Sequence, residues 1–98
     1  LDYRLYRAAD GLEAVQKVQS ESFDLVLMDI KMPRLNGMDA TREIRKTNKE
    51  IPIVALTAHA FNSDKEMAIA AGCNAYLVKP IDRKALFEVL RKYLSSEE

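Results

Sequence analysis

Residues 23–37 read FDLVLMDIKMPRLNG, and this stretch decides how the rest of the chain is interpreted. The apolar run from Leu25 to Met28 has the length of a buried strand, and Asp29 follows it directly. Pro33 and the pair Asn36-Gly37 then supply loop and turn residues. We therefore expect Asp29 at the carboxyl end of a buried strand, the edge of an open α/β sheet where ligands bind. An acid there can cap a helix, bind a metal, accept a phosphoryl group or act as a general base.

The composition indicates one small domain, and we expect residues 1–98 to form it. Lys plus Arg and Asp plus Glu are equal at 15 each, so the net charge is zero. This balance argues against a nucleic-acid-binding arm or a membrane-surface patch, which need clustered basic residues. The single cysteine, Cys73, cannot form an internal disulfide and is expected to be a small buried residue in a reducing compartment. Because no apolar run approaches the ~20 residues that span a bilayer, we expect a cytoplasmic protein.

Strand-like and helix-like segments alternate along the chain. Period-two alternation predicts a first strand over residues 1–7, near a sheet edge, with Leu5 on its apolar face and Tyr6 on its polar face. Continuous apolar runs predict buried strands over residues 25–28, 53–56 and 75–78. Amphipathic segments predict helices over residues 12–20, 38–46 and 64–71, and a last helix after Asp82. This order specifies a parallel sheet with helices on both faces.

Polar residues mark the starts of these helices, and apolar residues mark their inner faces. Asp10 is expected to cap the first helix, and Asn62 or Ser63 the third. In the second helix, Ile44 is expected to point inward with Met38 and Thr41, and Arg45 outward. In the third helix, Met67 and Ile69 are expected on an apolar side that is otherwise mostly alanine.

Three chemically distinct residues follow three of the predicted buried strands: Asp29, Thr57 and Lys79. Because parallel strands bring their carboxyl ends to one edge, we expect these residues to share a neighbourhood. Each alone has an ordinary interpretation as a capping acid, a buried hydroxyl or a surface lysine. Together they supply an attacking oxygen, a hydrogen-bond donor and a fixed positive charge, which are the parts that phosphoryl transfer needs.

Four motifs in this order closely resemble the receiver domain of two-component response regulators: MDIKMP at residues 28–33, NG at 36–37, ALTA at 55–58 and YLVKP at 76–80. The resemblance extends from Leu1 to about Leu94. It implies a flavodoxin-like α/β fold in which Asp29 accepts a phosphoryl group from a phosphohistidine on a histidine kinase or a histidine phosphotransfer domain. Such domains catalyse their own phosphorylation and dephosphorylation without being stand-alone metabolic enzymes. Residues 51–60 and 79–81 are more similar to receivers fused to hybrid sensor kinases than to those joined to DNA-binding domains.

The resemblance also implies a role for each residue around Asp29. Thr57 would donate a hydrogen bond to the acyl phosphate, and Lys79 would pair with one of its oxygens. On phosphorylation Thr57 and Tyr76 would move as a switch pair, because the added charge of roughly −1.5 to −2 draws the hydroxyl group toward it.

Further residues are placed beside the site by the same resemblance. The Lys79-Pro80 bond would be cis, and Lys31, Ala58 and His59 would line the approach to the phosphate. We interpret His59 as an exposed loop residue that modulates access rather than as a general base, and the Lys31 side chain as solvated. Magnesium is the expected cofactor of the complete domain, held by Asp29 and by the backbone carbonyl of Lys31.

The chain departs from the family pattern at its beginning. Receivers start with a strand that ends in an acidic pair, followed by a helix, whereas this sequence starts at what would be the second strand. We therefore expect at best a partial magnesium site, with the acidic pair absent from this chain. The missing strand would also leave a sheet gap beside the Asp29 strand, closed by direct pairing, by swapping between copies or by another chain. A longer natural protein, a deliberately cut fragment and an inactive variant are three explanations, of which we favour the first.

Other functions remain as alternatives. A truncated or engineered receiver fragment could lack phosphotransfer activity and self-assemble through exposed strand edges. An aspartyl-phosphate hydrolase of the haloacid dehalogenase type would need a second acid two residues after Asp29, where this chain has Lys31. A nucleotide- or flavin-binding domain would need a glycine-rich loop, but the turn Asp10-Gly11-Leu12 has one glycine. We therefore predict a phosphoacceptor switch of a phosphorelay, with neither nucleic acid nor membrane as a partner.

Overall fold

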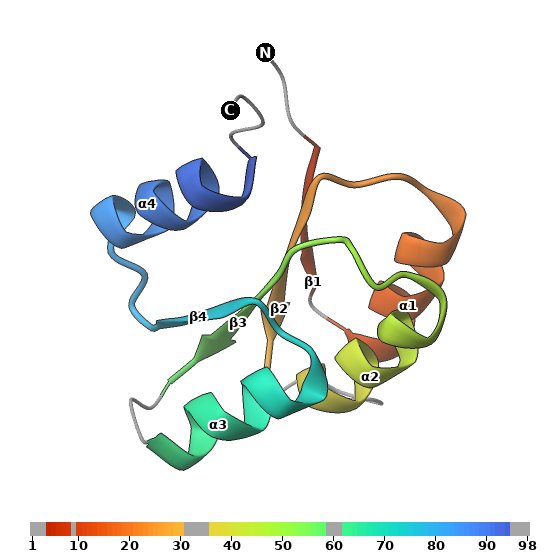
Figure 1. The fold of residues 1–98 in the computed structure, drawn as a ribbon, viewed down its shortest axis with the longest axis horizontal. Helices are drawn as coiled ribbons and strands as arrows, with labels where there is room; N and C mark the ends of the chain where they lie inside the picture. Colours follow the sequence, from red (N-terminus) through yellow and green to blue (C-terminus); the bar gives the residue numbers. More distant parts are fainter. Residues whose placement is uncertain (1–3, 9, 31–35, 59–61, 95–98) are drawn as a thin grey trace.

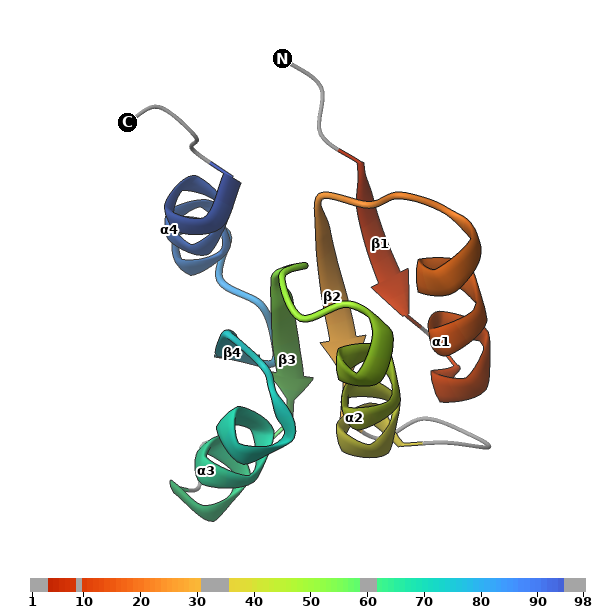
Figure 2. The ribbon, with the colours of Figure 1, turned by 45° about the vertical axis from the view of Figure 1, so that its right-hand side comes forward.

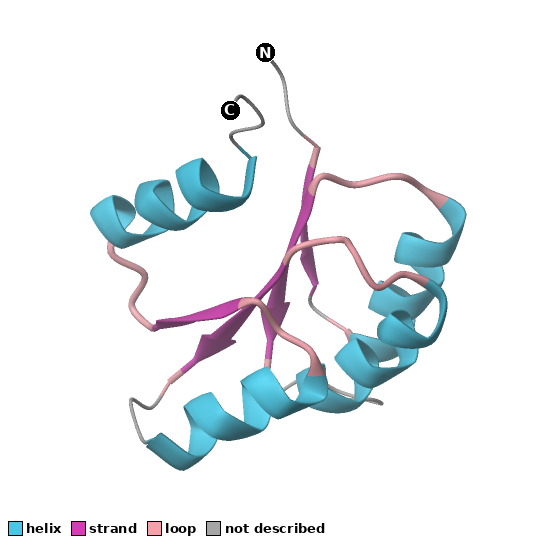
Figure 3. Cartoon of the chain, viewed as in Figure 1, coloured by secondary structure: helices cyan, strands magenta, loops and turns pink. Residues whose placement is uncertain are grey.

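The computed structural model describes residues 4–8, 10–30, 36–58 and 62–94, in which strands and helices alternate as predicted (Figure 1; Figure 3). The strands of this part are β1 (Leu5–Ala8), β2 (Leu25–Asp29), β3 (Ile53–Thr57) and β4 (Ala75–Val78). Its helices are α1 (Gly11–Ser20), α2 (Gly37–Thr47), α3 (Asn62–Ala71) and α4 (Arg83–Leu94).

The strands form one parallel sheet in the order β1-β2-β3-β4, which confirms the predicted α/β class. All five residues of β3 are buried, as expected for a continuous apolar run between two neighbouring strands. β1 lies at an edge of the sheet and pairs directly with β2, with Leu5 opposite Leu25 and Ala8 opposite Met28. The gap predicted at this place is therefore closed by direct pairing, one of the three routes considered.

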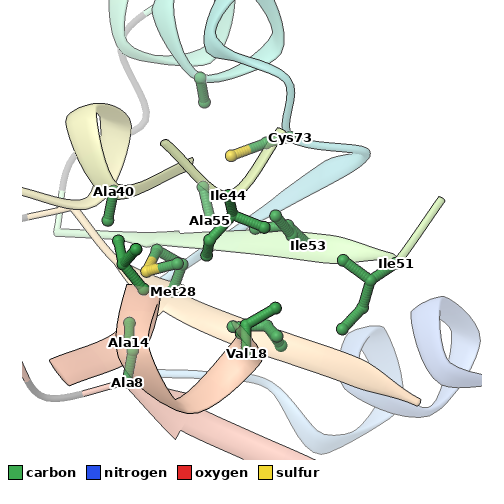
Figure 4. Close-up of a cluster of buried hydrophobic side chains, with 13 residues drawn as sticks. Ala8, Ala14, Val18, Met28, Ala40, Ile44, Ile51, Ile53, Ala55 and Cys73 are labelled. Carbon is green, nitrogen blue, oxygen red and sulfur yellow. The ribbon is translucent and has the colours of Figure 1, made fainter. Parts of the chain in front are cut away.

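The helices cover the two faces of the sheet unequally. Helices α1, α2 and α3 lie on one face, and α4 lies on the other (Figure 1; Figure 2). Under the first face is a large buried cluster, here called the three-helix core, part of which is shown in Figure 4. Its members are Ala8, Ala14, Val15, Val18, Val26, Met28, Ala40, Ile44, Ile51, Ile53, Ala55, Ala68 and Cys73. Fully burying a Val, Ile or Met side chain stabilises a fold by about 1.5–3 kcal/mol. The three-helix core therefore supplies much of the stability of the protein.

The opposite face has a smaller core, here called the α4 core. Four buried strand residues form its centre: Leu25, Val54, Leu56 and Leu77. Side chains of α4, among them Leu86, Val89 and Leu90, pack on this centre but stay partly exposed, and no residue of α4 is buried. A single amphipathic helix therefore closes this side.

Capping residues start three of the helices. The Asp10 side chain accepts hydrogen bonds from the amides of Leu12 and Glu13, which confirms it as the cap of α1. Asp82 accepts from the amide of Lys84 at 3.1 Å, as expected for the start of α4. Asn36, expected in a turn, instead caps α2 by accepting from the amide of Asp39 at 2.9 Å. Such caps are typically worth about 1 kcal/mol each.

Three predictions about α3 are wrong. The helix begins at Asn62, so Asn62 and Ser63 belong to its first turn rather than preceding it. Met67 and Ile69, expected on the apolar side, are each 50% exposed. The buried stripe is made instead by Ala68 and Ala71, because these small side chains let the helix lie close to its neighbours.

The two faces of β1 are also the reverse of the prediction. Tyr6 packs against the three-helix core together with the buried Ala8, whereas Leu5 is 43% exposed on the α4 side. The alternation was predicted correctly, but α1 covers the face that carries the tyrosine.

Arg45, expected to point outward, is partly buried and links α2 to the segment after α3. Its guanidinium donates to the Gly72 carbonyl at 2.9 Å and to the Asn74 side chain at 2.8 Å. Burial lowers the pKa of this guanidinium from its usual value. Ile44 and Thr41, on the same helix, are fully buried as predicted.

Cys73 lies in the three-helix core, as predicted for a small buried residue. Its sulfur is 3.6 Å from the Thr41 hydroxyl. Burial raises the pKa of the thiol, which disfavours the reactive thiolate form.

Candidate functional site

Backbone hydrogen bonds bring the carboxyl ends of β2, β3 and β4 together. Asp29, the last residue of β2, lies opposite Leu56, and the amide of the next residue, Ile30, donates to the Leu56 carbonyl at 3.0 Å. Thr57, the last residue of β3, accepts a hydrogen bond through its carbonyl from the Lys79 amide at 2.7 Å. The three strand ends therefore form one edge, as the parallel order required.

An ion pair joins two of the predicted site residues. The Lys79 ammonium donates to Asp29 Oδ1, although fifty positions separate the two residues in the sequence. The Asp29 side chain is only 18% exposed and that of Lys79 is 37% exposed, so the pair sits in a partly enclosed place. The Lys79-Pro80 bond that follows is cis, as the resemblance implied.

Thr57 lies between these two residues in the sheet. It ends β3, the strand flanked by the strand that carries Asp29 and by the strand that precedes Lys79. Thr57 is a buried polar residue. An acid, an alcohol and an amine are thus delivered to neighbouring strand ends.

Arg7 is a site neighbour that the sequence analysis missed. Its Nη2 atom lies 4.0 Å from Asp29 Oδ2, the carboxylate oxygen that Lys79 does not hold. The contact exists because β1 pairs directly with β2, which places Arg7 opposite Leu27, two residues before Asp29. Because side chains alternate along a strand, Arg7 lies on the same side of β1 as Leu5. If β1 had been assumed to pair directly with β2, this alternation would have predicted that Arg7 lies near Asp29.

The start of α2 is packed against the backbone that carries Asp29. The Gly37 amide donates to the Ile30 carbonyl at 2.8 Å. A Cβ atom on Gly37 would lie 2.1 Å from the Asp29 carbonyl oxygen, which is a severe steric clash. Glycine is therefore needed here so that the helix can approach the strand end.

The other predicted neighbours are placed as follows. Ala58 is exposed directly after β3, and Pro80 is exposed after Lys79. Tyr76 is partly buried in β4, with the Lys65 ammonium 4.8 Å from the centre of its ring. Lys31 and His59 lie outside the described residues.

The donor set around Asp29 bears on the expected magnesium. Within the described ranges, no three His, Cys, Asp or Glu residues are grouped so that they could hold a metal ion. Asp29 itself faces Lys79 with one oxygen and Arg7 with the other. Among the described residues this edge therefore offers magnesium one carboxylate, between two cations, which is fewer oxygen ligands than the ion takes; Lys31, whose carbonyl was the other expected ligand, lies outside those residues.

A sequence profile described as "Response regulator receiver domain" matches residues 1–91. The chain belongs to this family. A curated relative, the hybrid signal transduction histidine kinase G of Dictyostelium discoideum, is 48% identical over 89 residues, which are 88% of this chain and 3% of that protein. The receiver therefore spans a small part of the curated kinase that it matches.

Solved structures agree with this assignment. The receiver domain of a sensor histidine kinase from Pseudomonas aeruginosa, with magnesium coordinated in its active-site cleft, is 42% identical with a TM-score of 0.82, over 91% of this chain and 75% of that one. A Saccharomyces cerevisiae receiver, crystallised with a histidine phosphotransfer protein, is 25% identical with a TM-score of 0.83, over 95% of this chain and 91% of that one.

The predicted family, the flavodoxin-like receiver fold and the class of function are thereby confirmed: the chain is a phosphoacceptor module of two-component signalling. Within the part that the structure describes, no helix of the receiver is long and apolar enough to cross a bilayer.

Proposed function

We propose that Asp29 is the phosphoacceptor of this receiver, assisted by Lys79 and Thr57. The observation that carries the proposal is the ion pair between Asp29 and Lys79 at the carboxyl edge of the sheet, beside the end of β3. A carboxylate there is already an anion, so it needs no base to become a nucleophile.

The proposed step transfers one phosphoryl group from a phosphohistidine. An Asp29 oxygen forms a bond to phosphorus as the nitrogen–phosphorus bond of the donor breaks. The nitrogen keeps the electron pair of that bond, and the imidazole leaves in its neutral form after taking a proton from water. The Lys79 ammonium offsets charge on the phosphoryl oxygens, and the Thr57 hydroxyl donates a hydrogen bond to one of them.

The proposed donor is a histidine kinase or a histidine phosphotransfer domain. A hybrid histidine kinase among the relatives, and a yeast receiver crystallised with a phosphotransfer protein, support this class of partner. The cytoplasmic location of the protein stays a prediction. The extent of the domain, residues 1–98, also stays a prediction.

The proposed switch pairs Thr57 with Tyr76. Tyr76 lines a groove of about 440 Å³ together with Ile69 of α3 and Val89 and Tyr93 of α4. A tyrosine that turns inward when Thr57 moves toward the phosphate would change this groove, so the face made by α3, β4 and α4 would report phosphorylation.

Self-association through the edge strand β1 is the second candidate function. It is favoured by one observation, the exposed Leu5 on the edge strand β1. Light scattering at several concentrations tests it, because a concentration-independent monomer mass excludes assembly through this edge.

The phosphoacceptor proposal is tested by incubating the 98-residue chain with phosphoramidate and measuring its mass. We expect a gain of one phosphoryl group, which hydroxylamine removes because it cleaves acyl phosphates. Asp29→Asn abolishes the gain. Asp39→Asn, which alters an exposed acid on α2 that pairs with Arg42, leaves it intact. Labelling that survives Asp29→Asn would place the acceptor elsewhere.

A further inference from the structure

The ring of Tyr76, the proposed switch residue, is contacted by a lysine from the neighbouring helix. The ammonium of Lys65, in α3, lies 4.8 Å from the centre of this ring. A cation within about 6 Å of an aromatic ring is attracted by the negative potential of the ring face. Both residues are partly buried, so water screens the attraction less than it would at a fully exposed site.

The geometry of α3 places Lys65 beside the ring. Lys65 and Ile69 are four positions apart and therefore lie on the same side of the helix. Ile69 lines the groove of about 440 Å³ to which Tyr76 also contributes. The helix is packed closely through its buried alanines, Ala68 and Ala71. The lysine is thus anchored on a packed helix, next to the ring as it lies in the groove.

The contact belongs to only one of the two positions of the proposed switch. In this structure Tyr76 lines the groove between α3 and α4. In the proposed switch the tyrosine turns inward when Thr57 moves toward a phosphoryl group. This turn takes the ring face away from the Lys65 ammonium, so the attraction is lost. A contact that is made in one conformation and lost in the other shifts the equilibrium between them by its free energy.

We propose that Lys65 is a positioning residue of the switch, which holds the Tyr76 ring in the groove while Asp29 is unphosphorylated. This inference rests on the proposed function, in which Thr57 and Tyr76 move together. Lys65 sets the fraction of the unphosphorylated protein in which the ring is turned inward. Through that fraction it also sets how readily Asp29 is phosphorylated.

The first measurement follows the Tyr76 ring by NMR on protein labelled with carbon-13 tyrosine. The chain has four tyrosines, and Tyr76→Phe identifies the signal of interest. Lys65→Met removes the charge but keeps a long unbranched side chain. We expect it to move the Tyr76 signal of the unphosphorylated protein toward its position in the phosphorylated protein. The inward fraction should rise by about two- to fivefold, the factor that corresponds to a cation–π contact at a partly exposed site.

The second measurement is the rate of phosphorylation by phosphoramidate in the presence of magnesium, followed by the mass of the protein. Lys65→Met should raise this rate by about two- to fivefold, because a larger fraction of the protein has the conformation in which Thr57 lies near the phosphoryl group. Lys65→Arg should keep the signal and the rate of the unchanged protein, since a guanidinium supplies the same charge over the ring.

The matched control is Lys92→Met. The ammonium of Lys92, in α4, lies 5.4 Å from the centre of the Tyr93 ring, and both residues line the same groove as Tyr76. The control removes the same charge and the same kind of contact, but from a tyrosine that is not part of the switch. Its Tyr76 signal and its phosphorylation rate should equal those of the unchanged protein. Urea unfolding checks that each variant is folded.

The outcomes separate this inference from the proposed function. Suppose that Asp29 is labelled and that the Tyr76 signal moves on phosphorylation. If Lys65→Met then changes only one of the two measurements or neither, the role of Lys65 is overturned and the switch stands. The same conclusion follows if Lys65→Arg behaves like Lys65→Met, or if Lys92→Met has the same effect.

Two further outcomes contradict the proposed function itself. A Tyr76 signal that phosphorylation leaves unchanged contradicts the switch, and the role of Lys65 with it. A protein that is not labelled on Asp29 contradicts the proposed acceptor.

Discussion

The two faces of the sheet are built from the same strands but are closed in different ways. On one face α1, α2 and α3 together enclose a core in which Ala14, Ala40 and Ile44 are fully buried. On the other, α4 packs without burying any of its own residues, and Leu5 of β1 is exposed. The strand residues alone do not predict this difference, because Leu25 and Val26, on opposite faces of β2, are both fully buried.

The comparison shows where stability and chemistry reside. The three-helix face supplies the packing that fixes the strand ends, and α2 contacts the Asp29 backbone through Gly37. The open side leaves room for the exposed Arg7 side chain beside Asp29. We therefore expect substitutions in the three-helix core to lower the free energy of unfolding strongly. Substitutions on the α4 side should lower it less, and least where the sheet is uncovered.

The largest effect is expected from Ile44→Ala in the three-helix core. Ile44 is fully buried between α2 and the sheet, so its truncation removes apolar contacts and leaves a cavity. We expect a loss of about 4 kcal/mol in the free energy of unfolding, measured by urea denaturation. A loss below about 1.5 kcal/mol would show that this face is not the better packed one.

An intermediate effect is expected from Leu86→Ala in α4. Leu86 packs against the α4 core but remains partly exposed, so less area is lost and the cavity opens to solvent. The expected loss is about 1–2 kcal/mol, again from urea denaturation. An equal loss for Leu86→Ala and Ile44→Ala would remove the distinction between the two faces.

The smallest effect is expected from Leu5→Thr on the uncovered part of the sheet. Leu5 is 43% exposed, and threonine keeps a high preference for strands. The free energy of unfolding should change by less than about 0.5 kcal/mol. A large loss would instead indicate that Leu5 is covered in solution, which light scattering on both proteins would reveal as association.

Much of the fold could be predicted because the strands are continuous apolar runs that end in distinct polar residues. The runs predicted the bounds of β4, and β2 and β3 each extend one residue further than predicted, to Asp29 and Thr57. The convergence of Asp29 with Lys79 followed from the parallel order. These features depend on local patterns and on one topological rule, both of which a sequence displays.

Contacts between distant segments could not be predicted in the same way. Arg45 looks like an exposed helix residue, yet it binds Gly72 and Asn74 across the space between α2 and the end of α3. Arg7 reaches Asp29 only because β1 takes the place beside β2. In both cases the packing of the helices and strands determines which group the arginine side chain contacts. The sequence contains no periodic pattern from which that contact could be predicted.

The exposed Met67 and Ile69 show a further limit. A hydrophobic residue in a helix predicts burial only when the neighbouring element is near enough to cover it. Around α3, the buried stripe is made of alanines. The larger side chains are therefore left exposed, and one of them, Ile69, lines a groove together with Tyr76.

Gly37 imposes a constraint on how this protein can vary. Any larger residue there would meet the Asp29 carbonyl oxygen, so the helix could start only by moving away from the strand. Such a shift would break the hydrogen bond from the Gly37 amide to the carbonyl of Ile30, the residue after Asp29. A random library selected for folded proteins and one selected for phosphorylation should therefore both retain glycine at position 37. Selection for folding would then also preserve the reactive site.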